Sequence, residues 1–75
     1  MDFDQLETFL EVARTLSFSR AAEKRFRTQP AISAQIRQLE EEIGAKVFDR
    51  SGGKVSLTAA GKAFVKYVED RKSVV

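Results

Sequence analysis

Apolar side chains recur every three or four residues in four stretches of the chain, a spacing that places them on one face of an α-helix. The first stretch predicts a helix over about residues 3–16, with this apolar face: Leu6, Phe9, Leu10, Ala13 and Leu16. Asp2 and Gln5 have the spacing of a capping box, in which each side chain accepts a hydrogen bond from the backbone N–H of the other. We therefore expect the helix to begin directly after Asp2.

A short second helix is expected over about residues 20–26. The segment 17–19 interrupts the first periodicity, and Ser19 is a favourable N-cap residue. Ala21 and Ala22 are small, so a neighbouring helix can approach them closely.

The third apolar stripe predicts a helix over about residues 28–43, after a tight turn at 27–28. Its buried face is expected to be Ile32, Ile36, Leu39 and Ile43. Thr28 can cap this helix, and Pro30 is tolerated in its first turn because N–H groups there lack partners within the helix. Gly44 is a favourable residue at which to end it.

The pattern changes after Gly44, where short extended runs flank Ser51-Gly52-Gly53-Lys54. Adjacent glycines supply the positive φ angles of hairpin turns, so we expect a two-stranded ribbon here. Thr58 can then cap a fourth helix with this apolar face: Ala60, Phe64, Tyr67 and Val68. Ala63, Val65 and Val74 lie off that face and are more apolar than a free surface helix needs.

Two short helices joined by a tight turn, with a third packed across them, form a helix-turn-helix, whose second helix enters the major groove of DNA. A hairpin that follows directly and carries Arg50 and Lys54 is typical of a basic wing at residues 50–54, which reaches the phosphate backbone or minor groove. The sequence thus predicts a mainly α, winged helix-turn-helix fold with a three-helix core and a two-stranded β wing.

The face of the third helix away from its apolar stripe carries short and amide side chains. Glutamine can pair with an adenine edge, alanine can contact a thymine methyl group, and serine can bond to several base edges. On these grounds we expect base contacts from Gln29, Ala31, Ser33, Ala34 and Gln35. Contacts to phosphate, from the flanks of this helix and from the wing, are expected from Ser19, Arg20, Arg27, Arg37, Arg50 and Lys54.

The charge distribution supports a polyanionic partner, although the net charge of the 75 residues is only +2. Residues 20–37 hold one acid, Glu23, and the following basic residues: Arg20, Lys24, Arg25, Arg27 and Arg37. A mixed, solvated surface would account for the charges alone, so it is the helix-turn-helix spacing that favours DNA.

The composition argues against an enzyme. The chain has no cysteine and no histidine, which removes thiolate metal sites and the commonest general base. Ser33 and Lys46 could act as nucleophiles, but neither has a plausible base or orienting partner, and so small a helical domain offers little pocket volume. We expect no catalytic activity, cofactor or metal. No apolar run approaches membrane-spanning length and no signal peptide is recognisable, so a cytoplasmic protein without membrane contact is expected.

The sequence resembles the N-terminal domain of LysR-type transcriptional regulators. The matching stretches are QLETFLEVA at 5–13, SFSRAAE at 17–23, TQPAISAQIRQLEEEIGAKVFDR at 28–50 and VSLTAAG at 55–61. The resemblance implies a winged helix-turn-helix DNA-binding domain in residues 1–57 and the start of a linker helix in residues 58–75. It also places Thr28 and Pro30 among the recognition-helix contacts.

The resemblance further implies a homodimer that binds a promoter operator of dyad symmetry. The dimer interface would lie on the linker helix, at Ala63, Phe64, Tyr67 and Val68. Members of this family continue into an effector-binding domain, so a small-molecule effector would act through a domain that these residues do not contain.

Three departures from the family's usual pattern affect the expected contacts. Arg25, Phe26 and Arg27 stand where a leucine, a polar residue and a small aliphatic residue are more common. We expect Phe26 to supply the missing burial, Arg25 to snorkel at its edge and Arg27 to contact a phosphate. Gly53 in the wing and Ala34 in the third helix each replace a frequent arginine, which removes a possible DNA contact.

A second function class fits the same fold, namely a winged helix that docks a protein partner and does not contact DNA. Salt distinguishes the two, because phosphate contacts release counterions and make the affinity fall steeply as the salt concentration rises.

Overall fold

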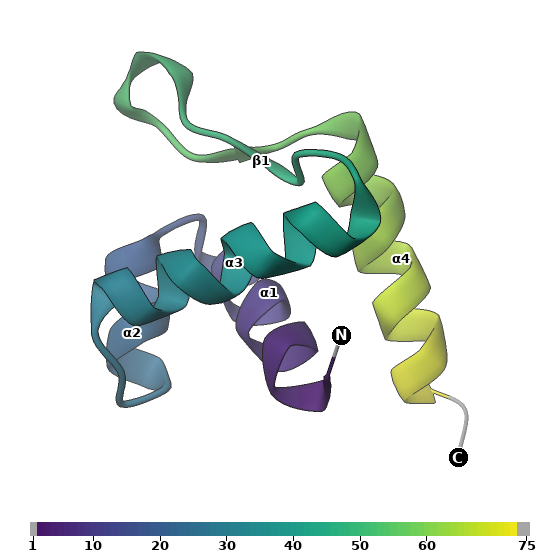
Figure 1. Cartoon of the computed structure of the whole chain (residues 1–75), viewed down its shortest axis with the longest axis horizontal. Coiled ribbons are helices and arrows are strands. Elements are labelled where there is room, and N and C mark those ends of the chain that lie inside the picture. Colours follow the sequence, from purple (N-terminus) through teal and green to yellow (C-terminus); the bar gives the residue numbers. More distant parts are fainter. Residues whose placement is uncertain (1, 74–75) are drawn as a thin grey trace.

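The computed structural model describes residues 2–73 and shows four helices and a small hairpin. In chain order these are α1 (Phe3–Thr15), α2 (Phe18–Lys24), α3 (Gln29–Ile43), β1 (Phe48–Asp49), β2 (Ser56–Leu57) and α4 (Ala59–Ser73). The helices α1, α2 and α3 pack against one another, while α4 packs against α1 and β2 (Figure 1). The hairpin lies beside α3, and the predicted winged helix-turn-helix is confirmed.

The start of α1 is the predicted capping box. The backbone N–H of Gln5 donates to Asp2 Oδ1 at 2.8 Å, and the backbone N–H of Asp2 donates to Gln5 Oε1 at 3.3 Å. The helix ends at Leu16, which has a left-handed φ of 53° and is 45% exposed. Leu16 is therefore not a core residue as expected, and Val12, which the stripe did not include, is fully buried instead.

The second helix begins two residues earlier than predicted. Ser17, not Ser19, is its N-cap, because the Ser17 side chain accepts from the backbone N–H of Arg20 at 3.1 Å. Phe18 thereby becomes the first helical residue and is buried in the core.

The third helix begins and ends where the sequence predicts. The Thr28 hydroxyl accepts from the backbone N–H of Ala31 at 3.3 Å, and Gly44 ends the helix with a left-handed φ of 83°. Ile32, Ile36 and Leu39 are buried, and Ile43 packs against the edge of the core.

Four phenylalanines from four different elements connect the core. The ring centroid of Phe9 in α1 lies 5.4 Å from that of Phe48 in β1 and 5.1 Å from that of Phe64 in α4. Phe18 in α2 lies 5.8 Å from Phe48, edge to face. Each such pair adds about 0.5–1.5 kcal/mol beyond the area it buries. The wing and α4 are thus joined to the helix-turn-helix by the same aromatic cluster.

The hairpin pairs antiparallel in the register Phe48 with Leu57 and Asp49 with Ser56. Its tip contains a short 3-10 turn, Ser51–Gly53, in which Gly52 and Gly53 have φ angles of 70° and 76°. The two glycines therefore have the predicted role in the turn.

The segment from Lys46 to Phe48 joins α3, the wing and α4. Thr58 donates from its hydroxyl to the carbonyl of Lys46 at 2.6 Å and from its backbone N–H to the carbonyl of Val47 at 3.1 Å. The Thr58 hydroxyl also accepts from the backbone N–H of Gly61 at 3.0 Å, which confirms that it caps α4. The Glu40 carboxylate, from α3, accepts from the backbone N–H of Val47 at 2.9 Å.

Gly61 allows α4 to approach this segment closely. A Cβ at this position would clash with the carbonyl oxygen of Val47 and come within 2.9 Å of Leu57 Cδ2. We expect Gly61→Ala to lower the free energy of unfolding by about 1–3 kcal/mol, because overpacking outweighs the better helix propensity of alanine. Urea denaturation measures this change.

The exposed neighbour Lys62 supplies the control, since Lys62→Ala should change the free energy of unfolding by less than about 0.5 kcal/mol. A stabilised Gly61→Ala variant would mean that helix propensity dominates and that the close approach is not a real constraint.

Candidate nucleic-acid interface

The N-terminal turn of α3 is exposed, as expected of a recognition helix. Thr28, Gln29, Pro30 and Ala31 are all exposed, one turn further on Ala34 is exposed, and Ser33 is half-buried. The free N–H groups and the positive end of the helix dipole favour an anion at such a terminus. The exposed part of α3 thus offers short side chains and a surface that suits phosphate.

Ser19 contacts the start of α3 from α2. Its hydroxyl donates to Oε1 of Gln29 at 3.2 Å, and both residues are exposed. This bond joins the two helices of the helix-turn-helix at their outer edge. It also holds the side chain of Gln29 at a defined place near the N-terminus of α3.

Gln35 lies on the other flank of α3 and is bonded to α1. Its Oε1 accepts from the Thr8 hydroxyl at 2.7 Å, and its Nε2 donates to Asp4 Oδ2 at 2.6 Å. The expectation that Gln35 contacts a base does not fit this arrangement, because both ends of its amide are directed at α1. Gln38, one turn further on, accepts from Nε2 of Gln5 at 3.0 Å, so three side-chain hydrogen bonds join this flank of α3 to α1.

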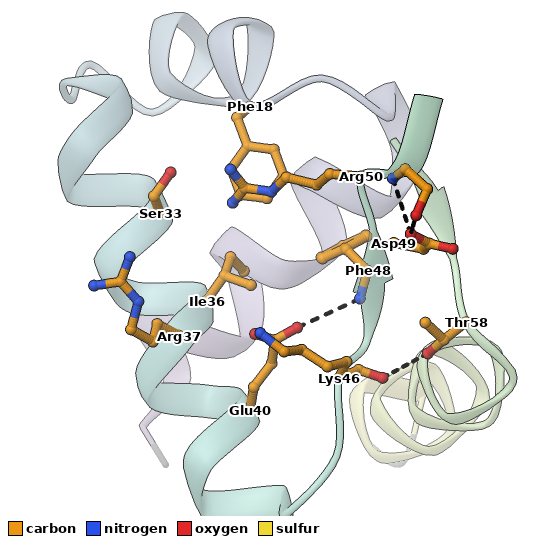
Figure 2. Close-up of a pocket in the computed structure, with 11 residues that line it drawn as sticks. Phe18, Ser33, Ile36, Arg37, Glu40, Lys46, Phe48, Asp49, Arg50 and Thr58 are labelled. Atoms are coloured by element: carbon orange, nitrogen blue, oxygen red, sulfur yellow. Dashed lines mark hydrogen bonds between the residues drawn. The ribbon is translucent and has the colours of Figure 1, made fainter. Parts of the chain in front are cut away.

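A groove of about 620 Å³ separates α3 from the wing on the opposite flank (Figure 2). Ser33 and Arg37 line it from α3, Lys46 lines its far end, and Arg50 lines it from the wing. Three predicted DNA contacts, Ser33, Arg37 and Arg50, are therefore brought together around one groove. Glu40 also lines it, but its carboxylate accepts hydrogen bonds from the backbone N–H groups of Val47 and Phe48.

Arg50 is held in place by Phe18, a residue that sequence reasoning did not select. The guanidinium carbon of Arg50 lies 3.8 Å from the centroid of the Phe18 ring, which is a cation–π contact. Figure 2 shows the two side chains stacked between α2 and the wing. The two residues are 32 positions apart, so no local sequence pattern predicts this contact.

A second groove of about 600 Å³ lies between the wing and the start of α2. Ser19, Gln29, Arg50 and Lys54 line it, and all four are predicted contact residues. Lys54 is exposed directly after the glycine turn, so the tip of the wing presents an ammonium group to solvent. Arg50 lines both grooves and so stands between the recognition helix and the wing tip.

Asp49, at the end of β1, binds the first residue of the turn at the tip of the wing. Its Oδ1 accepts from the Ser51 hydroxyl at 2.7 Å and from the Ser51 backbone N–H at 2.9 Å. These bonds from the Ser51 side chain and backbone hold the pKa of Asp49 below its ordinary value. The carboxylate thus stabilises the turn that directly follows β1.

The turn between α2 and α3 differs from the expectation. Phe26 does not supply burial: it is 94% exposed, with a left-handed φ of 56°. Arg25 lies inward instead, with a side chain that is only 21% exposed and forms an ion pair with Asp4. The reason is the backbone of the turn, whose left-handed residue directs Phe26 outward and leaves the inner position to Arg25.

Three side chains donate hydrogen bonds to the Asp4 carboxylate. Besides Arg25, it accepts from Arg27, whose Nη1 lies 3.0 Å from Asp4 Oδ2, and from Gln35. Arg27 is therefore paired within the chain, whereas the sequence predicted a free phosphate contact. The hydrogen bond from Gln35, followed by the hydrogen bond from Arg25 and the positive charges of Arg27 and Arg25, holds the pKa of Asp4 below its ordinary value, against an opposing effect of desolvation.

The apolar residues of α4 divide between the core and the surface. Val68 is fully buried within the chain, so the prediction that it lies at a dimer interface is corrected: it has no surface left for a partner. Ala63 is exposed, Tyr67 is 48% exposed, and Phe64 is half-buried and stacks on Tyr67. Val74 lies outside the described residues.

Within residues 2–73, no helix is both long and apolar enough to cross a membrane. The same residues contain no group of three or more acidic, histidine or cysteine side chains that could hold a metal ion.

The lowered pKa of Asp4 predicts a specific pH dependence. Because its pKa is lower in the folded chain, the stabilisation is present above the ordinary value of 3.8 and is lost as the pH falls through the folded value. Asp4→Asn should therefore lower the urea midpoint at about pH 7, and the difference from the native chain should shrink at about pH 3.

Glu23→Gln removes the same charge from an exposed position on α2 and serves as the control. An Asp4→Asn deficit of equal size at both pH values would contradict the assigned role of the carboxylate.

Comparison with known proteins agrees with this geometry. The family model of bacterial regulatory helix-turn-helix proteins of the lysR family matches residues 3–62. The HTH-type transcriptional regulator HdfR of Yersinia pestis is 51% identical over 69 residues, which cover 92% of this chain and 24% of HdfR. The chain thus spans about a quarter of the length of this curated relative.

Two solved structures have the same fold and contain DNA. The complex of the BenM DNA-binding domain with catB site 1 DNA matches with a TM-score of 0.90 and 36% identity, over 97% of this chain and 82% of that one. The CbnR DNA-binding domain in complex with DNA matches with a TM-score of 0.91 and 34% identity, over 99% of this chain and 85% of that one. The family match, the relative and the fold together establish that this chain belongs to the LysR family of bacterial helix-turn-helix transcriptional regulators.

Proposed function

We propose that this chain is the DNA-binding part of a LysR-type regulator and binds double-stranded DNA in a sequence-specific manner, with α3 in the major groove. The observation that carries this proposal is the groove between α3 and the wing, around which Ser33, Arg37 and Arg50 converge. The neighbours crystallised with DNA support it, as does the exposed N-terminal turn of α3. A bacterial regulator of promoters acts on DNA in the cytoplasm, so we propose that location.

The proposed contacts fall into two groups. Base contacts come from the N-terminal part of α3 and are assigned to Thr28, Gln29, Pro30, Ala31, Ser33 and Ala34. Phosphate contacts come from Ser19, Arg20, Arg37, Arg50 and Lys54, which are exposed on α2, α3 and the wing. This division follows the general rule that phosphate contacts position a protein on the duplex, whereas base contacts specify the sequence.

We further propose that two copies bind together through α4. The residues still available for this contact are Ala63, Phe64 and Tyr67, because Val68 is used by the core of the single chain. Residues 1–57 would then form the DNA-binding unit, and residues 58–75 would begin the linker helix that joins the two copies. Two-fold symmetry would give an operator of dyad symmetry with half-sites about 34–36 Å apart, or a multiple of that distance. Any response to a small-molecule effector would belong to parts of the full protein beyond these residues.

The proposal is tested by selecting bound duplexes from a randomised DNA pool at low and moderate salt. We expect a recurring motif with dyad symmetry and retention that decreases as the salt concentration rises. Retention without any motif would contradict sequence-specific binding. No retention at either salt concentration would favour the alternative function, a winged helix that docks a protein.

Single substitutions should separate the two groups of contacts. Gln29→Ala is expected to relax the preference at one base pair of the selected site, by about 1–3 kcal/mol if the contact is bidentate. Lys54→Ala should instead weaken binding to all duplexes alike and lower the salt slope by about one unit. Competition binding with the selected duplex and its single-base variants measures both effects.

Glu41→Ala, on the exposed C-terminal half of α3, is the control and should leave the preferred sequence unchanged. An unchanged preference in Gln29→Ala would contradict the assignment of Gln29 to a base.

A further inference from the structure

Asp4 places a carboxylate beside the basic turn that precedes α3. Its two oxygens face both Nη atoms of Arg27: Arg27 Nη1 lies 3.0 Å from Oδ2, and Arg27 Nη2 donates to Oδ1 at 3.1 Å. The pair is thus bidentate, and it connects the first turn of α1 to the residue directly before Thr28, the N-cap of α3.

This ion pair is exposed enough to open. The side chains of Arg27 and Asp4 are 40% and 38% exposed, and ion pairs of such exposure are weak because water and salt screen them. A phosphate is also a good bidentate partner for a guanidinium group. The free N–H groups and the positive dipole end at the N-terminus of α3 favour an anion, so a phosphate near Thr28 would compete with Asp4 for Arg27.

We propose that Asp4 is an internal competitor for phosphate: it occupies Arg27 in the free protein, and DNA must displace this carboxylate before Arg27 can contact the backbone. The inference rests on the proposed function. It concerns the sequence-independent part of the affinity, because Arg27 carries no base contact. By offsetting one phosphate contact, Asp4 lowers the affinity for all duplexes alike. Base contacts then contribute a larger fraction of the total binding free energy.

Salt dependence reveals this exchange. A phosphate contact releases a counterion from DNA, with a contribution of about 0.9 to the slope of log K against log salt. In the native chain the freed Asp4 carboxylate attracts a cation from solution, which offsets part of that release. Without the carboxylate, the contact of Arg27 should appear in the slope in full.

Arg25 complicates the simple substitution at Asp4. Its side chain is 21% exposed, its Nε is buried without a hydrogen-bond partner among the described residues, and its charge is also paired with Asp4. Asp4→Asn alone would leave this guanidinium uncompensated and could reduce folding. Arg25→Leu removes the problem, since it takes away the charge and places an apolar side chain at this partly buried position.

The experiment compares four folded proteins on one duplex that lacks the selected motif, between about 50 and 200 mM salt. These are Arg25→Leu, Arg25→Leu with Asp4→Asn, the same pair with Arg27→Gln, and Arg25→Leu with Glu23→Gln as the charge control. We expect Asp4→Asn to steepen the slope by up to about 0.9, so that the loss of affinity over this range grows up to about 3.5-fold. Arg27→Gln should abolish this increase, and Glu23→Gln should not reproduce it.

The alternative results are distinct. An unchanged slope in the Asp4→Asn protein, an equal increase with Glu23→Gln, or an increase that persists with Arg27→Gln would each overturn the competition between Asp4 and phosphate. If the Arg25→Leu parent folds but shows no salt-dependent binding at all, the proposed function itself fails. The same titration is then repeated with the native chain, which keeps Arg25, and with its Asp4→Asn variant. Thermal unfolding first establishes that both proteins are folded.

Discussion

Burial of Ile32, Ile36 and Leu39 is the constraint on which the rest of the surface depends. These side chains are at most 2% exposed and hold one face of α3 against α1 and α2. Once that face is fixed, the rotation of the helix about its axis is fixed as well. One flank then meets α1 through Gln35 and Gln38, and the other opens onto the groove beside the wing. The asymmetry of α3 thus follows from a stripe of three apolar residues.

The position of the wing depends in turn on the backbone of Val47. Its N–H donates to the Glu40 carboxylate of α3, its carbonyl accepts from the backbone N–H of Thr58, and Gly61 of α4 leaves room for this carbonyl because it has no Cβ. Phe48 follows directly and packs against the rings of Phe9 and Phe18 in the core. Because polar backbone bonds and an aromatic cluster act at adjacent residues, the start of the wing is fixed on two sides. This rigidity is what allows Arg50, two residues later, to remain between the recognition helix and the wing tip.

The sequence predicted the fold because its signals are local and agree with one another. The apolar periodicity, the caps at Asp2 and Thr28, and the glycines at 44 and 52–53 each specify one element or turn. Contacts between elements were harder to predict. The stacking of Arg50 on Phe18 and the bonds of Gln35 to Thr8 and Asp4 join residues 27 to 32 positions apart, and helical periodicity cannot reveal such pairs.

The errors at the turn have one physical cause. From the family resemblance, Arg25 stands where a buried leucine is expected. The adjacent Phe26 was therefore predicted to be buried in its place, since an aromatic ring is more hydrophobic than a guanidinium group. The left-handed backbone at Phe26 directs that ring outward, so backbone geometry outweighs hydrophobicity here. Arg25 can lie inward because Asp4, 21 residues earlier, supplies the opposite charge. The same carboxylate explains why Arg27 is paired, which the sequence alone gave no reason to expect.

One surface, formed by the start of α3 and the wing, is proposed to contact DNA. The most direct test is to record the backbone amide NMR signals of the chain before and after adding its selected duplex. We expect the largest shifts at residues 28–34, apart from Pro30, and at 50–54, with little change at Gln5 of α1 and at Glu41 on the flank of α3 that faces α1. Largest shifts at Gln5, Glu41 or the C-terminal half of α4, with the signals of residues 28–34 unmoved, would contradict it.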